Sequence, residues 1–415
     1  MKIYKFGGAS VKNAKHIINV ANILKSEGYE NVVVVISAMG KMTNAFESMI
    51  LSYLGNKSDL STKIKTIEKF HKTILNDLFE KEHEIYTRIN MFFGEIAHFF
   101  IHNKNKNYDY VYDQIISYGE LLSTTIVSAY FSEIGIVNKW IDARKLIRTD
   151  TTYRNSKVDW KETSIQIQKE IKDNIHYITQ GFIAGASDSV TTTLGREGSD
   201  YSAAILAYCL DAESLTIWKD VAGVLNADPR YFSKTTLLNQ ISYSETLEMA
   251  FFGASVIHPK TIKPLENKEI PLYVRSFIDT SVKGTTIKKG ISISPLTSCF
   301  NIKNNQILLS IAAKDFSFMI EHNISHVFDL FAKYKVSVNL IQNSALSFSV
   351  CIEDTYNQFD ALIQEFSNHY RVRYNKNVRL LTIRHFTDDD IKKTKANNKI
   401  LLSQLTDKTV QFVMH

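Results

Sequence analysis

A strand, a helix and a second strand follow one another directly in residues 3–36, which read IYKFGGASVKNAKHIINVANILKSEGYENVVVVI. The first strand, Ile3–Phe6, ends in two glycines, and Ala14–Lys25 carries apolar residues at helical spacing. Val32–Ile36 is an unbroken valine-rich run, which is typical of a parallel strand buried on both faces. This order predicts the start of a doubly wound α/β fold.

The alternation of helices and strands continues to about residue 290. Residues 41–135 are predicted to be largely helical. Four further strands are predicted, each separated from the next by helical or loop sequence: Lys139–Ile141, His176–Ile178, Leu215–Trp218 and Pro271–Val274. We therefore expect one large α/β domain, residues 1–292, with a largely parallel sheet.

The pattern changes after Pro295. Strands and helices are predicted in the order βαββαβ over residues 303–375, which is the order of a ferredoxin-like unit. Residues 376–415 repeat part of this order but lack room for a last helix and strand. We expect a reduced second unit there.

Composition narrows the class of protein. The 415 residues include 49 Lys and Arg against 43 Asp and Glu, and the net charge of +6 is too mild to indicate a nucleic-acid-binding surface. A hydrophobic content of 44% excludes global disorder. Because neither a secretory signal nor a long apolar run is present, we expect no membrane span and a cytoplasmic location. The three cysteines fit no disulfide or zinc pattern, so we expect a reducing compartment, and we assign no metal ligands.

The first glycine pair, Gly7 and Gly8, stands where a predicted strand gives way to a helix. Backbone N–H groups at such a turn can point at an anion, and the helix dipole adds to the attraction. Lys5 lies at the carboxyl end of the strand, where ligands of open α/β sheets bind. Phosphate binding and an ordinary turn with a surface lysine are equally compatible with these residues alone.

A second glycine-rich loop occupies residues 191–203, TTTLGREGSDYSA. Its arginine suits bidentate binding of a carboxylate or phosphate, and Ser199 or Asp200 is predicted to cap the following helix. Two loops of this kind favour an anionic ligand over two ordinary polar turns. Residues 117–124 (SYGELLST) and 218–230 (WKDVAGVLNADPR) also carry charged residues, but by themselves they are typical of a solvated helix and of a proline-containing loop.

Taken together and in order, these motifs resemble those of aspartate kinase, a member of the amino acid kinase superfamily that carries regulatory ACT domains. The resemblance rests on seven motifs: Lys5–Val11, Ile36–Ala38 with Thr43-Asn44, Ser117–Thr124, Ile141–Arg144, Ile178–Ala184, residues 191–205 and residues 217–230. It covers essentially the whole chain. It implies a three-layer, amino-acid-kinase-like sandwich followed by ACT units.

The resemblance also implies a reaction, the ATP-dependent phosphorylation of the side-chain carboxylate of L-aspartate to 4-phospho-L-aspartate and ADP. This is the first step of lysine, threonine and methionine synthesis. The accepting carboxylate is ionised at pH 7, so the reaction needs positioning and charge neutralisation rather than a general base. Mg²⁺ is expected to arrive with ATP, because Mg²⁺ commonly binds through substrate phosphates.

Each matching residue receives a role from the resemblance. The implied catalytic residues are Lys5, Arg196 and Asp200, with Lys5 on the transferring phosphoryl group. The implied phosphate contacts are Lys5, Gly7, Gly8, Ser10 and Ser199. The implied aspartate site comprises Ser37, Ala38, Thr43, Glu120 on the α-ammonium group, and Arg196 on a carboxylate. The implied ATP contacts are Lys219, Asp220, Asp228 and Arg230.

Four residues depart from the family pattern near the nucleotide: Glu197 for a glycine, Lys219 for a threonine, Leu225 for a tyrosine and Ser255 for a lysine. Lys219 or Lys260 could supply the missing positive charge. In the ACT-like region, Asn339 stands where an inhibitor-contacting aspartate is frequent. Feedback by lysine or threonine and a mainly structural, homodimer-forming role of this region therefore both stay open.

Two other functions remain open on the sequence. One is a kinase for a related acidic amino acid such as glutamate. The other is an amino-acid-binding regulatory protein with a decayed kinase domain, which Glu197 and Ser255 favour and Lys5, Arg196 and Asp200 oppose.

Overall fold

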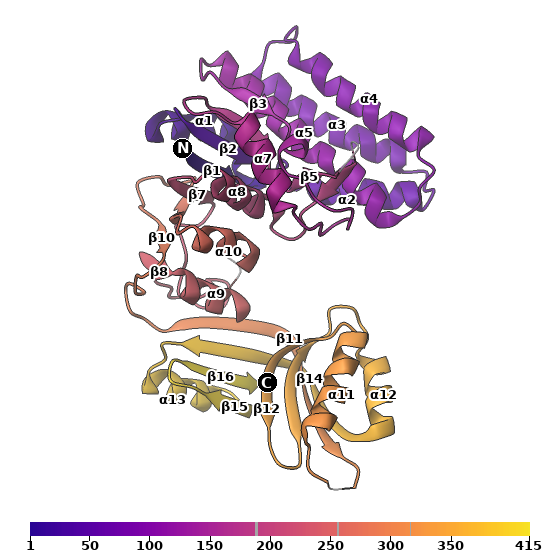
Figure 1. Ribbon diagram of the computed structural model, residues 1–415, viewed down its shortest axis with the longest axis vertical. Coiled ribbons are helices and arrows are strands. Elements are labelled where there is room, and N and C mark those ends of the chain that lie inside the picture. Colours follow the sequence, from indigo (N-terminus) through magenta and orange to yellow (C-terminus); the bar gives the residue numbers. More distant parts are fainter. Residues whose placement is uncertain (187–189, 255–256, 316) are drawn as a thin grey trace. The chain divides into compact units, whose positions relative to one another are not determined.

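The computed structural model describes residues 1–186, 190–254, 257–315 and 317–415 (Figure 1). The chain divides into two units. The first comprises Met1–Val224, Leu237–Leu247 and Ile257–Ile293, and the second comprises Leu225–Thr236, Glu248–Val256 and Ser294–His415.

The first unit is built on a sheet whose described strands follow the order β3-β4-β2-β1-β7-β9-β10-β8. The strands are β1 (Lys2–Phe6), β2 (Val32–Ile36), β3 (Lys139–Ile141), β4 (Tyr177–Gln180), β7 (Ser214–Lys219), β8 (Gln240–Ser242), β9 (Leu272–Ser276) and β10 (Thr285–Lys288). In this sheet order, each strand from β3 through β4, β2, β1 and β7 to β9 is parallel to its neighbour. The strand β10 is antiparallel to β9 and parallel to β8. The predicted largely parallel sheet is confirmed. A separate hairpin pairs β5 (Ile183–Gly185) with β6 (Thr191–Thr193).

Strand order places the carboxyl ends of β1, β2 and β7 together. Lys5 is in register with Val35 of β2 and with Ile217 of β7. Ser37 follows β2 directly, and Lys219 is the last residue of β7. Residues separated by more than 200 positions along the chain therefore meet at one edge of the sheet, where open α/β folds bind ligands.

Helices cover the sheet of the first unit. They are η1 (Gly8–Val11), α1 (Ala14–Glu27), α2 (Met42–Leu54), α3 (Leu60–Leu78), α4 (Ile85–His102), α5 (Tyr108–Glu133), α6 (Ala143–Leu146), α7 (Trp160–Glu170), α8 (Gly198–Cys209) and α10 (Pro259–Asn267). One continuous apolar core joins β1 and β2 to the helices α1–α5, and Figure 1 shows α2–α5 grouped as one layer. All five residues of β2 are buried, as its unbroken valine run predicts. The helix α9 (Tyr243–Phe251) passes from the first unit into the second along the chain.

The second unit contains an antiparallel sheet in the order β12-β13-β11-β14-β16-β15. Its elements are β11 (Cys299–Ala313), α11 (Glu321–Lys333), β12 (Ser337–Asn343), β13 (Phe348–Glu353), α12 (Phe359–His369), β14 (Tyr370–Arg384), α13 (Asp388–Asn397), β15 (Ile400–Leu405) and β16 (Thr409–Met414). The predicted βαββαβ order is confirmed over β11–β14.

Two long strands join the halves of this second sheet. β11 and β14 pair along their length, with an irregularity in register between Lys303 and Leu308. The first part of β11, Cys299–Lys303, lies against Leu380–Arg384, which in turn pairs with β16. The C-terminal half of the sheet thus takes a strand from residues that precede the βαββαβ segment. In the described part of the chain, no helix has both the length and the apolar character required to cross a bilayer.

We predict that Leu309→Ala weakens the second unit by about 2–5 kcal/mol, because Leu309 of β11 is fully buried in an apolar core that also contains residues of α11 and α12. Urea unfolding followed by circular dichroism measures the change. The matched control is Leu405→Ala in β15, where the leucine is 63% exposed, and it should cost less than about 0.5 kcal/mol. Equal losses for the two variants would contradict the assigned core.

Candidate functional site

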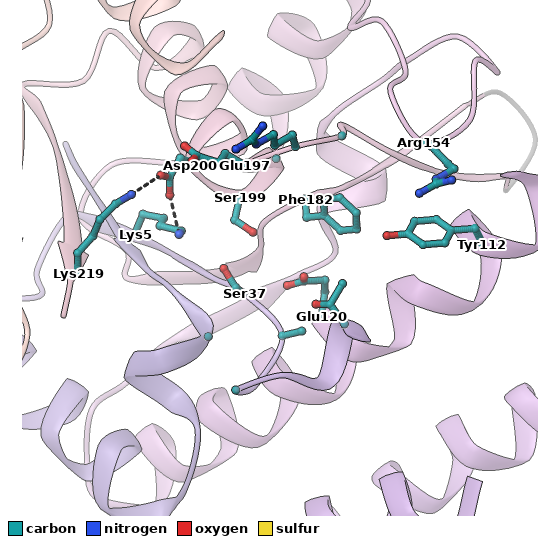
Figure 2. Close-up of a pocket in the computed structure, with 17 residues that line it drawn as sticks. Lys5, Ser37, Tyr112, Glu120, Arg154, Phe182, Glu197, Ser199, Asp200 and Lys219 are labelled. Carbon is teal, nitrogen blue, oxygen red and sulfur yellow. Dashed lines mark ion pairs between the residues drawn. The ribbon is translucent and has the colours of Figure 1, made fainter. Parts of the chain in front are cut away.

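A cavity of about 560 Å³ lies in the first unit at the carboxyl ends of β1, β2 and β7 (Figure 2). Most of the residues predicted to form the site line it: Lys5, Gly8, Ser37, Ala38, Thr43, Glu120, Arg196, Ser199, Asp200 and Lys219. The structure therefore brings together the first glycine loop, the end of β2, the middle of α5 and the start of α8.

Asp200 is shared by two lysines at one end of this cavity. Its Oδ1 lies 2.6 Å from Lys5 Nζ, and its Oδ2 lies 3.4 Å from Lys219 Nζ. Burial by itself would raise the pKa of the Asp200 carboxyl, but Lys5 and Lys219 together outweigh it and hold that pKa below its usual value. The aspartate is therefore a fixed anion that holds two ammonium groups at the same place (Figure 2).

The start of α8 differs from the prediction. The helix begins at Gly198, and its N-cap is Glu197 in the left-handed region at φ 52°, without a side-chain cap hydrogen bond. Ser199 and Asp200 lie inside the first turn, so the predicted capping role for either residue is wrong. Asp200 faces the lysines instead. In the first turn, the Gly198 amide donates to the Gly195 carbonyl over 2.9 Å and the Asp200 amide donates to the Glu197 carbonyl over 3.1 Å.

Glu197 adds a second carboxyl group at this end of the cavity. Burial raises its pKa, Lys219 lowers it and the neighbouring Asp200 raises it again, with a net rise. Its Oε2 is buried and has no hydrogen-bond partner among the described residues. The departure at Glu197 therefore places a second buried carboxyl group beside Asp200.

The first glycine loop packs closely against the end of β2. A Cβ atom at Gly8 would lie 2.5 Å from the Ala38 carbonyl oxygen and 2.9 Å from that of Gly40, so only glycine fits there. The Gly40 amide donates to the Gly8 carbonyl over 2.9 Å, and the Ser37 amide donates to Phe6. These contacts fix one wall of the cavity.

Glu120 lies on α5, deep in the same cavity. Burial raises the pKa of its carboxyl group to about 8, although contacts with the Ala38 amide and Lys5 lower it in part. Its Oε2 has no hydrogen-bond partner among the described residues. A buried carboxyl group with an unused acceptor is suited to a cationic ligand group.

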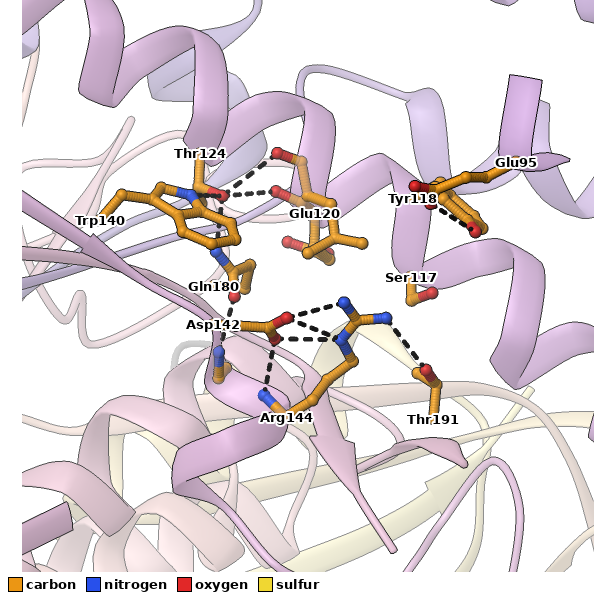
Figure 3. Close-up of polar contacts among 12 residues, drawn as sticks. Glu95, Ser117, Tyr118, Glu120, Thr124, Trp140, Asp142, Arg144, Gln180 and Thr191 are labelled. Carbon is orange, nitrogen blue, oxygen red and sulfur yellow. Dashed lines mark hydrogen bonds and ion pairs between the residues drawn. The ribbon is translucent and has the colours of Figure 1, made fainter. Parts of the chain in front are cut away.

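A hydrogen-bond network holds the helix turn that carries Glu120 (Figure 3). The Thr124 hydroxyl donates to the Glu120 carbonyl over 3.0 Å, and it accepts from Gln180 Nε2 at 2.7 Å and from Trp140 Nε1 at 3.0 Å. Gln180 Oε1 in turn accepts from the Ala143 amide at 2.7 Å. The strands β3 and β4 thereby position the α5 wall.

Five predicted residues do not line this cavity. The Ser10 hydroxyl is buried and donates to the Gly7 carbonyl over 2.6 Å, so both residues shape the turn behind Gly8. Asp220 is exposed next to Lys219. Asp228 and Arg230 belong to the second unit, where they form an ion pair of 2.5 Å that lowers the pKa of Asp228. Their predicted roles stay predictions.

The sequence predicts that Lys219 or Lys260 compensates for the positive charge missing at Ser255. Ser255 lies outside the described residues. Lys260 donates to Asn155 Oδ1, whereas Lys219 lines the cavity. Of these two lysines, Lys219 is the one that lines the cavity, and its compensating role stays a prediction.

The sequence reasoning missed Gly40, Tyr112, Arg154 and Phe182, which also line the cavity. Arg154 and Phe182 have positive φ angles of 65° and 70°, which non-glycine residues seldom adopt. No local pattern marks them, because their positions depend on contacts made by distant segments. Such strained residues are often found at functional sites.

The arrangement suits an anion at one end and a cationic group nearby. Lys5, Lys219 and the start of α8 can neutralise phosphate charge, and Glu120 can accept from an ammonium group. Within the described residues, no group of three or more His, Cys, Asp or Glu side chains could hold a metal ion.

Comparison with known proteins agrees with this geometry. Residues 1–276 match the amino acid kinase family. The chain is 34% identical to lysine-sensitive aspartokinase 3 of Escherichia coli over 249 residues, which cover 59% of this chain and 55% of that protein. It is 30% identical to the bifunctional aspartokinase/homoserine dehydrogenase of Buchnera aphidicola over 418 residues, which cover 92% of this chain and 49% of the relative. The chain thus spans about half the length of these curated relatives.

The fold is similar over the whole chain to a solved structure. This is E. coli aspartokinase III in complex with aspartate and ADP, with a TM-score of 0.84 and 27% sequence identity. The match covers 100% of this chain and 96% of that one.

We predict that Glu120 makes the stability of the ligand-free protein depend on pH. Its pKa rises from 4.5 to about 8 on folding, so the folded protein holds a proton between these values that the unfolded chain releases. Stability should therefore fall as pH rises through this window, by about 1.4 kcal/mol per pH unit relative to Glu120→Gln. Urea unfolding of both proteins at pH 5, 6, 7 and 8 measures the difference, and parallel pH profiles would contradict a buried, protonated Glu120.

Proposed function

The chain belongs to the amino acid kinase family, and from that premise we propose that it phosphorylates the side-chain carboxylate of L-aspartate. ATP donates the phosphoryl group, and the products are 4-phospho-L-aspartate and ADP, the first step of lysine, threonine and methionine synthesis. The observation that carries the proposal is one cavity in which the Lys5–Asp200–Lys219 ion cluster lies beside the buried Glu120. The named relatives are aspartokinases, and one solved structure similar to this chain contains aspartate and ADP.

The phosphate end of the proposed reaction is the ion cluster. Lys5 and Lys219 neutralise charge on the transferring group, and Asp200 keeps both ammonium groups in place before ATP binds. The N-terminus of α8 adds a favourable helix dipole. Because the cations are already fixed, little reorganisation is needed when charge shifts in the transition state.

The amino-acid end is organised by Glu120. An α-ammonium group beside it supplies the positive charge that its buried carboxyl group lacks, so substrate binding lowers its pKa and ionises it. The pairing fixes one end of the substrate and leaves the side-chain carboxylate to face Lys5. That carboxylate is already an ion at neutral pH, so no residue has to remove a proton.

We propose that Mg²⁺ enters the site bound to the nucleotide. The described residues offer no acidic or histidine cluster for it, and the cations of the cavity favour phosphate instead. When it is bound to ATP, the ion neutralises phosphate charge.

The regulatory part of the proposal concerns the second unit. We propose that it forms a homodimer and that lysine or threonine is the effector. The E. coli relative described above is named for its sensitivity to lysine. Asn339 already accepts from Lys303 Nζ at 2.8 Å and donates to Gln306 Oε1 at 2.7 Å. A cytoplasmic location belongs to the same proposal, since Cys209 and Cys351 are buried thiols that form no disulfide bond among the described residues.

We predict that the purified protein forms aspartate hydroxamate from L-aspartate, Mg-ATP and hydroxylamine, which traps the acyl phosphate. Lys5→Met should lower kcat at least 100-fold, because it removes a cation from the transferring group. The matched control is Lys2→Met in the same strand, whose side chain is exposed and should leave kcat within twofold.

The outcomes of this assay separate the competing functions. Hydroxamate formed only with glutamate would assign the chain to another acidic amino acid. No turnover with any acid, together with binding of an amino acid, would indicate a regulatory protein. Full activity of Lys5→Met would refute the role of Lys5.

We further predict that lysine or threonine, added separately at millimolar concentration, lowers aspartate-dependent turnover at subsaturating aspartate. Asn339→Ala should weaken the inhibition without changing turnover in the absence of effector, because it breaks the two hydrogen bonds described above. Turnover insensitive to both amino acids would leave the second unit with a structural role.

A further inference from the structure

Glu197 is held at the phosphate end of the cavity in a backbone conformation that non-glycine residues seldom adopt. Its φ of 52° lies in the left-handed region, and its carbonyl oxygen accepts from the amides of Asp200 and Tyr201, each over 3.1 Å. A Cβ atom at Gly198 would lie 2.7 Å from Phe182 Cδ2, so the next residue must be small. The start of α8 therefore fixes the backbone from which the Glu197 side chain extends. That side chain lines the cavity beside Asp200 (Figure 2).

Among the described residues, the carboxyl group of Glu197 has an oxygen that the fold does not use. Glu197 is the N-cap residue of α8, but its side chain makes no cap hydrogen bond. Its Oε2 is buried, and no described residue forms a hydrogen bond with it. The ammonium groups of Lys5 and Lys219 are already held by Asp200, over 2.6 and 3.4 Å. A buried carboxylate oxygen without a donor is costly, whereas a protonated carboxyl group carries a donor of its own.

Charged residues on β1, β7, α8 and the loop before α8 act on Glu197. Burial is the largest effect on its carboxyl group and raises its pKa, and the neighbouring Asp200 raises that pKa as well. Lys219, Lys5 and Arg196 lower the pKa, but the net result lies above the usual value. The group therefore keeps its proton to a higher pH than a solvated glutamate does. A phosphate group held by Lys5 and Lys219 would add negative charge and raise this pKa further.

The proposed reaction brings hydrogen-bond acceptors to this end of the cavity. The phosphate oxygens of the nucleotide accept hydrogen bonds strongly, and Lys5 and Lys219 supply the positive charge that attracts them. A protonated carboxyl group offers these oxygens an O–H donor, whereas an ionised one would repel them. Carboxylic acids that their surroundings keep neutral serve as donors in other active sites.

We infer that Glu197, in its protonated form, donates a hydrogen bond to a phosphate oxygen of the nucleotide and thereby makes nucleotide affinity depend on pH. The inference rests on the proposed function for the identity of the ligand and adds a binding residue to it. The proton stays on Glu197, so no covalent bond forms or breaks. As pH rises, Glu197 loses the proton, the donor disappears and the carboxylate repels the phosphate. Nucleotide affinity therefore falls as pH rises.

Binding of ADP tests the inference without turnover. Isothermal titration calorimetry at pH 6, 7 and 8, with and without Mg²⁺, gives the dissociation constants of the wild type, Glu197→Gln and Glu197→Gly. The glutamine keeps a neutral N–H donor at every pH, and the glycine removes the side chain and suits the positive φ. The matched control is Glu269→Gln, because Glu269 also has a positive φ, of 56°, but forms an exposed ion pair with Lys289. Melting temperatures show that each variant is folded.

We expect the dissociation constant of the wild type to rise with pH relative to that of Glu197→Gln, by at most about tenfold per pH unit, because one proton is linked to binding. At pH 6, Glu197→Gln should bind ADP within about threefold of the wild type, and Glu197→Gly at least about tenfold more weakly. The heat of binding in buffers of different ionisation enthalpy should show a larger proton uptake for the wild type than for Glu197→Gln. Glu269→Gln should match the wild type throughout.

Three results would overturn the inference. Equal or tighter binding by Glu197→Gly would show that the carboxyl group contributes no donor. Parallel pH profiles for the wild type and Glu197→Gln would show that no proton on Glu197 is linked to binding. A loss in Glu197→Gln that occurs only with Mg²⁺ would assign the carboxylate to the metal ion instead. A wild type that binds ADP as expected but forms no aspartate hydroxamate would refute the proposed reaction alone, so the two failures are distinguishable.

Discussion

The site depends on the buried ion pair between Asp200 and Lys5, which Lys219 extends. A buried carboxylate without partners would be costly, and two ammonium groups at the end of neighbouring strands would repel each other. The three groups therefore require one another, and their charges sum to +1. An incoming phosphate meets a cationic pair whose position the protein has already fixed. Adjacent strands β1 and β7, together with the start of α8, are what allow this contact.

Carboxyl groups of one cavity behave differently because their surroundings differ. Asp200 has a lowered pKa beside two lysines, whereas burial with few partners raises the pKa of Glu120 and Glu197. The pKa of Asp113, which does not line the cavity, is also raised, to about 6, because burial outweighs the hydrogen bonds that its carboxyl group accepts from Arg154 and Thr193. Asp200 is thus kept ionised and holds the two lysines, while the carboxyl group of Glu120 is available to pair with a cationic ligand group. This division of roles follows from desolvation and nearby charge rather than from residue type.

Local patterns predicted much of the fold, whereas most of the predicted residues that line the cavity came from the family resemblance. The valine run of β2 and the glycine pair at the start of η1 were recognisable because hydrophobic patterning and backbone requirements act over a few residues. The cap of α8 was predicted wrongly, since the sequence cannot tell whether Asp200 bonds its own helix or a distant lysine. The short strands β8 and β10 carried too few residues to show an alternation.

By itself, the sequence determined that an α/β fold begins at residue 3, that two glycine-rich loops open helices, and that the motifs are those of an amino acid kinase. Tertiary structure alone decided that Lys5, Asp200 and Lys219 share one point, that Cys299–Lys303 completes the C-terminal half of the second sheet, and that Arg154 faces the cavity. The physical reason is the distance along the chain over which each interaction acts. Propensity and periodicity act between neighbours in the chain, whereas burial, ion pairing and strain are set by residues that only folding brings into contact.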